Sequence, residues 1–278
     1  MPELPEVETI ARGLAARVSG EVIESIWLGE KPEPLKSSAQ EIAAAVEHTR
    51  ILTVRRMGKH IVFDLQPAKL SRKAASTQVT AQWIVHLGMT GRMLVCDARS
   101  EILKHTHAIA KLDSGRELRF VDPRRFGRLS VAAAGNFETA GTEPLEAEVD
   151  RFIALFRGRK TPIKSALLNQ KLLRGVGNIY ADESLFRTGI RPRRRAASIT
   201  REQLAKLLES IKEVLREAIV LGGSSVSDYV GADGQEGFFQ LQHRVYGREG
   251  EPCLMCKTPI KRVVIAGRSS HYCPKCQR

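Results

Sequence analysis

The first residues of the chain carry a possible nucleophile. The sequence begins Met1-Pro2-Glu3-Leu4-Pro5-Glu6, and methionine is normally trimmed ahead of a residue as small as proline, which would leave Pro2 with a free secondary amine. A free α-amino group has a pKa near ~8, against roughly 10.4 for lysine, so it is far more often neutral at pH 7. A neutral amine beside carboxylates can attack a sugar aldehyde carbon and form an iminium, or Schiff base. The same prolines also suit the first turn of a helix, so this segment alone leaves both interpretations open.

Four of the five cysteines lie close to the end of the chain, in two C-x2-C pairs. Each pair can chelate one tetrahedral ion through its thiolates, and short strands at 263–265 and 271–272 are expected to form a hairpin between the pairs. A redox dithiol needs only one pair, so the duplication favours a structural metal. The sequence therefore predicts one zinc ion bound by Cys253, Cys256, Cys273 and Cys276.

The charge of the chain favours a polyanionic partner. Lys and Arg number 44 against 31 Asp and Glu, which gives a net charge of +13, and an excess of this size most simply indicates a nucleic acid backbone. The junction Gly175-Val176-Gly177-Asn178 can present backbone N–H groups to a phosphate, although it also fits an ordinary turn. No apolar run approaches the ~20 residues of a membrane span. The acidic N-terminus has no secretory apolar region, so a cytosolic location is expected.

Two turns carry residues that suit base extrusion. Asp122-Pro123-Arg124-Arg125-Phe126-Gly127 presents guanidinium groups and an aromatic ring, and a protein that extrudes a base needs an apolar wedge and a donor for the orphaned partner base. Met89, in His86-Leu87-Gly88-Met89-Thr90-Gly91, would be a second wedge. Each of these apolar residues, taken alone, also fits a place in the core. Lys59, between Gly58 and an expected strand, is by itself most simply an ordinary surface lysine.

The first half of the chain is expected to be a β domain. A helix over 7–18 and a second helix near 40–48 flank short runs of β-forming residues, whose spacing predicts an antiparallel sandwich or barrel. The segment 67–82 is expected to be a mobile excursion between two strands. The expected strands are Val22–Leu28, Ile51–Arg56, His60–Leu65, Trp83–Leu87, Arg92–Val95, His107–Leu112, Glu117–Val121 and Arg128–Val131.

The second half has helical signals. Thr161-Pro162 predicts one helix start, Asn178 is expected to cap a helix over 179–186, and Thr200 with Gln203 forms a capping-box pattern. Gly222-Gly223 is expected to end the helix that Thr200 begins. The segment 224–242 is rich in Gly and Ser, and its composition fits either a plain linker or a loop that closes over a ligand.

Together these residues resemble the bacterial formamidopyrimidine-DNA glycosylase family, also called Fpg or MutM, over nearly the whole chain. The endonuclease VIII enzymes also begin Met-Pro-Glu, but they typically have Gly where this chain has Leu4, and they lack the set of wedge residues. The matching motifs are Met1-Pro2-Glu3-Leu4-Pro5-Glu6-Val7-Glu8-Thr9, His86-Leu87-Gly88-Met89, Asp122-Pro123-Arg124-Arg125-Phe126-Gly127, Gly175-Val176-Gly177-Asn178-Ile179-Tyr180, Val245-Tyr246-Gly247-Arg248 and the four cysteines.

The resemblance implies an α+β fold: an N-terminal two-layer antiparallel β-sandwich with flanking helices, and a C-terminal helix–two-turn–helix domain plus a zinc-finger β-hairpin. The expected parts are a catalytic sandwich at 1–134, a linker at 135–150, the helical DNA-binding domain at 151–223, a lesion-recognition loop at 224–243 and the zinc finger at 244–278. A monomer that binds damaged duplex DNA in the cleft between its domains is expected.

The resemblance also implies an activity in base excision repair. A bifunctional DNA glycosylase and AP lyase would excise oxidised purines, 8-oxoguanine and formamidopyrimidines, and then cleave the abasic strand by β,δ-elimination. Pro2 would be the nucleophile at C1′, Glu3 the acid that protonates the opening ribose, and Lys59 would assist β-elimination. Arg268 would assist δ-elimination, mainly as a phosphate clamp, because the pKa of arginine exceeds ~12. Met89, Arg124 and Phe126 would fill the gap left by the flipped base, and the residues expected to bind the DNA backbone are His105, Arg124, Arg159, Lys164, Asn178 and Arg268.

Two features depart from the family pattern, and two other functions stay open. The basic insert near 69–82 is longer than usual, and Thr142 stands where the family commonly has proline. One alternative is an endonuclease VIII-type enzyme that acts on oxidised pyrimidines. The other is a non-catalytic zinc-ribbon DNA-binding protein whose acidic N-terminus only starts a helix.

Overall fold

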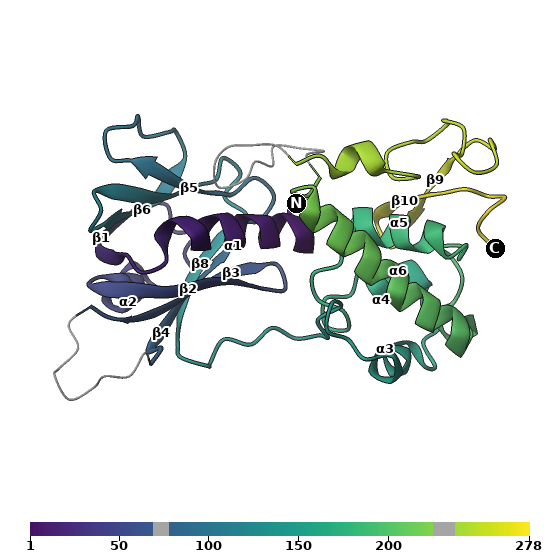
Figure 1. Ribbon diagram of the computed structural model, residues 1–278, viewed down its shortest axis with the longest axis horizontal. Coiled ribbons are helices and arrows are strands. Elements are labelled where there is room, and N and C mark those ends of the chain that lie inside the picture. Colours follow the sequence, from purple (N-terminus) through teal and green to yellow (C-terminus); the bar gives the residue numbers. More distant parts are fainter. Residues whose placement is uncertain (69–77, 225–236) are drawn as a thin grey trace. The chain divides into compact units, whose positions relative to one another are not determined.

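The computed structural model describes residues 1–68, 78–224 and 237–278. The chain divides into two compact units (Figure 1): Met1–Glu138 with Ser224–Gly237, and Thr139–Gly223 with Phe238–Arg278. The chain passes from the first unit to the second within the segment 135–150. The helices that follow residue 139 and the cysteine-bearing hairpin share the second unit.

The first unit is built on an antiparallel sheet. Its strand order is β5-β7-β6-β1-β2-β3-β4-β8, and every expected strand forms. Alternating buried and exposed side chains, bounded by turn residues, explain why the sequence predicts these strands well. The strands are β1 (Val22–Leu28), β2 (Thr49–Met57), β3 (His60–Pro67), β4 (Ala81–His86), β5 (Arg92–Asp97), β6 (Thr106–Leu112), β7 (Arg116–Val121) and β8 (Arg128–Ala133).

Strand β1 divides this sheet into two layers. Val22 and Ile23 pair with β2, and after an irregularity between Ile23 and Ser25 the rest of β1 pairs with β6. A bulge of this kind bends a strand and increases its twist, so the sheet folds over at β1. Strands β5 and β8 are the edges within the described part of the sheet. The fold is therefore the two-layer sandwich and not a closed barrel.

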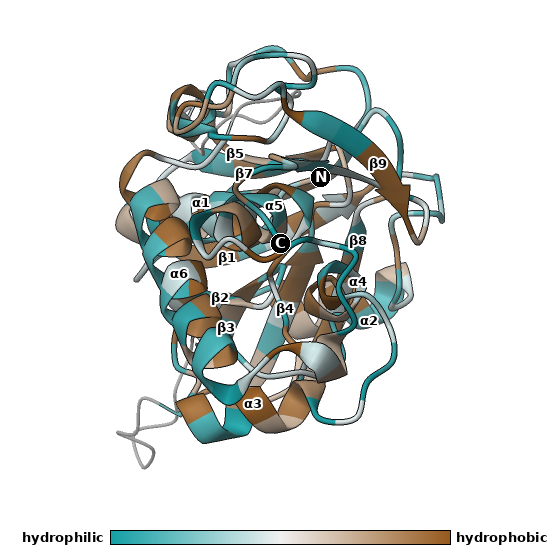
Figure 2. Ribbon diagram, turned by 90° about the vertical axis from the view of Figure 1, so that its right-hand side faces the viewer, coloured by the Kyte–Doolittle hydropathy of each residue, from teal (hydrophilic) through white to brown (hydrophobic). Residues whose placement is uncertain are grey.

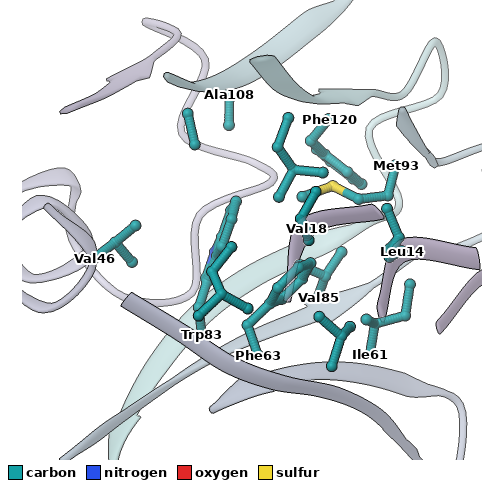
Figure 3. Packing of buried hydrophobic residues seen from close by; sticks show 14 of the residues in the cluster. Leu14, Val18, Val46, Ile61, Phe63, Trp83, Val85, Met93, Ala108 and Phe120 are labelled. Carbon is teal, nitrogen blue, oxygen red and sulfur yellow. The ribbon is translucent and has the colours of Figure 1, made fainter. Parts of the chain in front are cut away.

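One apolar core lies between the layers (Figure 3). Phe63 and Trp83 stack with ring centroids 5.0 Å apart, and Phe120 comes to the same cluster from the other layer. Leu14 and Val18 of helix α1 (Leu4–Val18) pack into this cluster, and so do the buried side chains of helix α2 (Ala39–Val46). Complete burial of one such side chain contributes about 1.5–3 kcal/mol, so this shared core holds α1 firmly against the sheet.

Helix α1 does begin at the N-terminal motif. Its first residue is Leu4, Pro5 occupies the second helical position, and Glu3 is the N-cap. The backbone N–H of Glu3 donates to Glu6 Oε2 at 2.8 Å. The prolines therefore serve a helix start, which leaves the amine of Pro2 outside the helix.

The second unit consists of helices and one hairpin. Helix α6 begins with the expected capping box of Thr200 and Gln203, whereas Asn178 is the first residue of α5 and Gly177 is its N-cap. Helix α3 was not predicted, because its start lies in the segment interpreted as linker. The elements are α3 (Val149–Phe156), α4 (Ile163–Leu167), α5 (Asn178–Arg187), η1 (Ala196–Ser198), α6 (Arg201–Val220), η2 (Phe239–Gln242), β9 (Lys261–Ile265) and β10 (Arg268–Tyr272).

Helix α6 is amphipathic, with apolar and polar residues on different sides (Figure 2). Its buried stripe includes Leu204, Leu208 and Ile211, and this stripe packs against α3 and α5. Within the described ranges, none of the helices has the length and apolar character needed to cross a membrane.

Thr142 has a structural role that proline could not fill. Its backbone N–H donates to the Leu172 carbonyl at 2.8 Å, and its carbonyl accepts from the Arg174 N–H at 3.0 Å. Proline has no N–H to give. The departure from the family pattern thus adds a hydrogen bond within the second unit.

Candidate active site and nucleic-acid interface

The residues expected to act on the sugar lie at the start of α1. Pro2 and Glu3 are both buried. Glu6, whose Oε2 accepts from the Glu3 N–H, also accepts from the Ser224 backbone N–H through Oε1 at 2.8 Å. Ser224 is the last described residue before 225–236, and most of the expected lesion-recognition loop lies outside the described residues. Glu6 therefore joins the N-terminal segment to Ser224, where the expected loop begins, a role that the sequence analysis did not assign.

Lys59 lies in the tight turn between β2 and β3. Met57 pairs with His60 across this turn, and Gly58 has φ of 60°, a conformation that favours glycine. Lys59 is only 8% exposed, so it is not an ordinary surface lysine. Arg56 donates to the Gly58 carbonyl at 3.2 Å and to Glu8 of α1 at 2.8 Å. These contacts fix the lysine turn relative to the helix that carries Glu3.

Two histidines pack beside this turn. The ring centroids of His60 and His86 are 4.9 Å apart. Burial, together with the nearby His60, Lys59 and Arg128, lowers the pKa of His86 to about 4. Burial also lowers the pKa of His60. His86 is therefore neutral near pH 7, and its Nδ1 accepts the Gly88 backbone N–H at 3.1 Å, which shapes the turn that leads to Met89.

The three expected wedge residues lie on the surface of the first unit. Met89 is 40% exposed and Phe126 is 49% exposed, so neither belongs to the core. The guanidinium carbon of Arg124 lies 4.8 Å from the centroid of the Phe126 ring, within the range of a cation–π contact. The structure thus presents a sulfur-containing side chain, a cation and a ring to solvent in the same unit as Pro2, Glu3 and Lys59.

His105 and Arg159 are exposed residues of different units. His105 has φ of 70°, which is uncommon outside glycine, and its carbonyl accepts the Asp122 backbone N–H at 2.9 Å. Arg159 follows α3, and its Nε donates to the Leu155 carbonyl. Both side chains are open to solvent, as a phosphate contact requires.

Three further residues expected at the DNA backbone meet around Ser269 in the second unit. Asn178 Nδ2 donates to Ser269 Oγ at 3.3 Å. Lys164 Nζ donates to the Ser269 carbonyl at 2.6 Å. Arg268, which follows the hairpin tip at Ala266 and Gly267, is exposed on the adjacent position of β10. A network from α4 and α5 therefore holds the strand that presents Arg268.

The structure corrects the expectation for Lys164. Its side chain has no exposed area and forms an ion pair with the equally buried Asp182, with Nζ and Oδ1 2.6 Å apart. Asp182 Oδ2 also accepts the His271 backbone N–H at 2.9 Å. A lysine enclosed in this way does not reach a phosphate. Lys164 instead supports the hairpin by donating to the Ser269 carbonyl on β10. No local pattern signalled this role, because the partners of Lys164 lie 18 and 105 residues away along the chain.

The four terminal cysteines form a zinc site. Their Sγ atoms all lie within 4.8 Å of one another, with Cys253 to Cys276 at 3.9 Å and Cys256 to Cys273 at 3.4 Å. Tetrahedral zinc with Zn–S bonds of about 2.3 Å places its ligands about 3.8 Å apart, so these residues fit the ion. Hydrogen bonds from Thr258 lower the pKa of Cys256 to about 6, whereas burial raises the pKa of Cys273 and of Cys276. Because four protein ligands leave no open coordination position, the zinc ion is structural.

Comparison with known proteins agrees with this geometry. Residues 1–129 match the model of the formamidopyrimidine-DNA glycosylase N-terminal domain, residues 140–230 match the H2TH domain of the same enzyme, and residues 250–278 match the zinc finger found in FPG and IleRS. A formamidopyrimidine-DNA glycosylase of Solibacter usitatus is 45% identical over the full length of both chains. The chain belongs to the formamidopyrimidine-DNA glycosylase family.

Solved structures of this family have the same fold. The MutM (FPG) protein of Thermus thermophilus is 40% identical and superposes with a TM-score of 0.85, over 99% of this chain and 98% of that one. A mutant FPG of Lactococcus lactis in complex with a Fapy-dG containing DNA is 30% identical, with a TM-score of 0.88 over 100% of both chains. The protein is therefore a DNA-binding glycosylase of base excision repair with one structural zinc ion. The alternative of a non-catalytic zinc-ribbon protein is wrong, whereas the choice of oxidised purines over oxidised pyrimidines stays a prediction.

Proposed function

We propose that this formamidopyrimidine-DNA glycosylase excises oxidised purines, 8-oxoguanine and formamidopyrimidines, from duplex DNA and then cleaves the strand at the abasic site. The observation that carries the choice of substrate is the exposed set of Met89, Arg124 and Phe126, in the same unit as Pro2 and Glu3. The Lactococcus lactis relative bound to a Fapy-dG containing DNA supports the same substrate class.

Pro2 is the proposed nucleophile. After removal of Met1, its secondary amine attacks C1′ of the damaged nucleotide while the bond from C1′ to the base breaks. The base leaves with the bonding electrons, and the proton of the attacking amine passes to the departing base. Glu3 protonates the ring oxygen as the ribose opens, which gives an iminium between Pro2 and C1′. The burial of Glu3 and the contact between its backbone and Glu6 support this role, because a fixed acid needs no reordering during the reaction.

Strand cleavage follows from the iminium. It acidifies the C2′ proton, so that loss of this proton expels the 3′ phosphate, and a second elimination expels the 5′ phosphate. Hydrolysis then returns the free amine of Pro2. Lys59 assists the first elimination from its buried turn, and Arg268 stabilises the negative charge of a leaving phosphate. Guanidinium groups suit this task because they bind phosphate oxygens with two donors.

The proposed contacts to the DNA backbone come from both units. His105 and Arg124 in the first unit, and Arg159, Asn178 and Arg268 in the second, supply donors that are exposed or half-buried. Extruding a base costs a few kcal/mol, and Met89, Arg124 and Phe126 offset part of this cost by filling the space in the stack. A monomer is proposed to act alone in the cytoplasm, associated with the nucleoid through its DNA binding.

Borohydride trapping tests this proposal. The substrate is a duplex with one 8-oxoguanine opposite cytosine, and the expected product is a reduced protein–DNA adduct that maps to Pro2. Pro2→Gly should lower turnover and spare DNA affinity, while Glu3→Gln should bind the same duplex without releasing the base. Excision of thymine glycol in strong preference to 8-oxoguanine would refute the substrate class, and an adduct on any residue other than Pro2 would refute the mechanism.

A further inference from the structure

Asp122 begins the turn that carries two of the wedge residues, and its own side chain is fully buried. It follows β7 directly and precedes the turn of Arg124 and Phe126. Its carboxylate accepts from three groups. The Thr90 hydroxyl donates to Oδ1 at 2.5 Å, the Arg124 backbone N–H donates to Oδ1 at 3.3 Å, and the Gly127 backbone N–H donates to Oδ2 at 2.7 Å.

The backbone of Asp122 is engaged as well. Its N–H donates to the carbonyl of His105 at 2.9 Å, and its carbonyl lies 2.9 Å from Nε2 of His107. One buried residue therefore contacts the turn of Met89 through Thr90, the turn of Arg124 and Phe126 through its own carboxylate, and the segment of His105 through its main chain.

Close backbone packing joins the same two turns. A Cβ atom at Gly88 would lie 2.5 Å from the Gly127 nitrogen and 2.5 Å from the Phe126 carbonyl carbon. A Cβ atom at Gly127 would lie 2.5 Å from the ring of Phe120. Neither glycine can take a side chain without moving a neighbour, so the two turns are in direct contact and cannot shift independently.

We infer that Asp122 is a positioning residue that joins Met89, Arg124, Phe126 and His105 into one preformed wedge. The inference rests on the proposed function, because it assigns these side chains to base extrusion. Hydrogen bonds to a buried carboxylate are stronger than neutral ones, and a wedge that is already ordered loses little entropy when DNA arrives. Asp122 and Thr90 therefore affect the extrusion of a paired base, and they do not affect the chemistry at C1′.

The test removes one hydroxyl and keeps the shape of the side chain. Thr90→Val loses the donor to Asp122, whereas Thr90→Ser retains it. Thr53→Val is the matched control, because the hydroxyl of Thr53, on strand β2 of the same unit, also donates to a carboxylate, Asp64 Oδ2 on β3, at 2.8 Å. Asp122→Asn is a second variant. The amide N–H of asparagine would face the N–H and O–H donors that now bind the carboxylate, so some of these hydrogen bonds would be lost.

Two substrates separate extrusion from chemistry. The first is a duplex with 8-oxoguanine opposite cytosine and 2-aminopurine beside the lesion, and the second is a duplex with a preformed abasic site. We expect Thr90→Val to lower the rate of excision and the rate of the 2-aminopurine fluorescence change about tenfold. The loss of a hydrogen bond to a charged group predicts an effect of this size. Cleavage at the abasic site should stay within about twofold of the wild-type rate, and Thr90→Ser and Thr53→Val should match the wild type on both substrates.

A second measurement needs no DNA. Hydrogen exchange at the Arg124 and Gly127 amides should accelerate in Thr90→Val and Asp122→Asn and stay slow in Thr53→Val. Unchanged exchange would overturn the inference, and so would equal slowing of both substrates. If the wild-type protein did not excise 8-oxoguanine, the proposed function would fail, and the exchange result would still decide whether Asp122 holds the turns together.

Discussion

Replacement of Lys164 by Met distinguishes a buried support from a phosphate contact. Lys164 and Asp182 have no exposed side-chain area, and their charged atoms are 2.6 Å apart. Removing one partner of such a pair leaves an uncompensated buried charge, which costs about 3–5 kcal/mol of unfolding free energy. A loss of this size should lower the melting temperature of the second unit by roughly 10 °C or more. The Ser269 carbonyl would also lose its donor.

Urea unfolding and DNA binding should be measured on the same samples. A second variant, Lys164→Met with Asp182→Asn, removes both charges and should recover much of the stability that the single variant loses. The matched control is Lys206→Met, because Lys206 pairs with Glu202 on α6 at 2.8 Å while both side chains are exposed. This exposed pair should have little effect on unfolding.

The salt dependence of DNA binding tests whether Lys164 contacts a phosphate. Each phosphate contact that is lost reduces the slope of log affinity against log salt by about 0.9. Arg268→Ala should show this reduction, because Arg268 is exposed at the hairpin. If Lys164→Met also reduced the slope by about 0.9 while its unfolding free energy stayed at the wild-type value, Lys164 would reach a phosphate, and the inference from its burial would be wrong.

Three further predictions follow from the site. Cys253→Ala should release the zinc ion and weaken DNA binding, because one lost thiolate opens a tetrahedral site; metal analysis together with a binding assay checks this, and full retention of zinc would contradict it. Between pH 6.5 and about 4 the unfolded chain protonates His86 while the folded protein resists, so the free energy of unfolding should fall as the pH falls through this range. When unfolding is measured at a series of pH values, the free energy of unfolding should fall less for His86→Asn than for the wild type. An unchanged pH profile would show that His86 does not contribute to the pH dependence. Arg56→Leu should lower turnover more than DNA affinity, because it frees the Lys59 turn from α1; a loss confined to affinity would argue against it.

The elements of the fold could be predicted because their signals are local. Strands β1 to β8 follow alternating patterns that end at turn residues, and the capping box at Thr200 lies within four residues of sequence. Helix α3 was missed because its start lies in the segment interpreted as linker, and because it packs against α6, an element distant in sequence. The metal ligands were predictable from spacing alone, since each pair needs only one short turn.

The supports of the site could not be predicted in this way. Asp122 stands inside a motif that was recognised, but its partner Thr90 lies 32 residues away. Glu6 meets Ser224 across 218 residues. Nothing in the local sequence distinguishes these acids from exposed ones, because only the folded chain brings their donors within reach. Lys164 was misplaced for the same reason.

These buried acids also change how the charge of the protein should be understood. Among the described residues, eight Asp or Glu residues are buried but only three Lys or Arg residues are. Glu6, Asp122 and Glu183 accept backbone N–H groups there, and Glu183 alone accepts from Arg244, Val245 and Tyr246. Other buried acids, such as Asp64 and Glu143, pair instead with Arg55 and Arg174, whose side chains reach the surface. Because Glu6, Asp122 and Glu183 are used by backbone N–H groups, these three carboxylates do not compete with DNA phosphates for the exposed arginines.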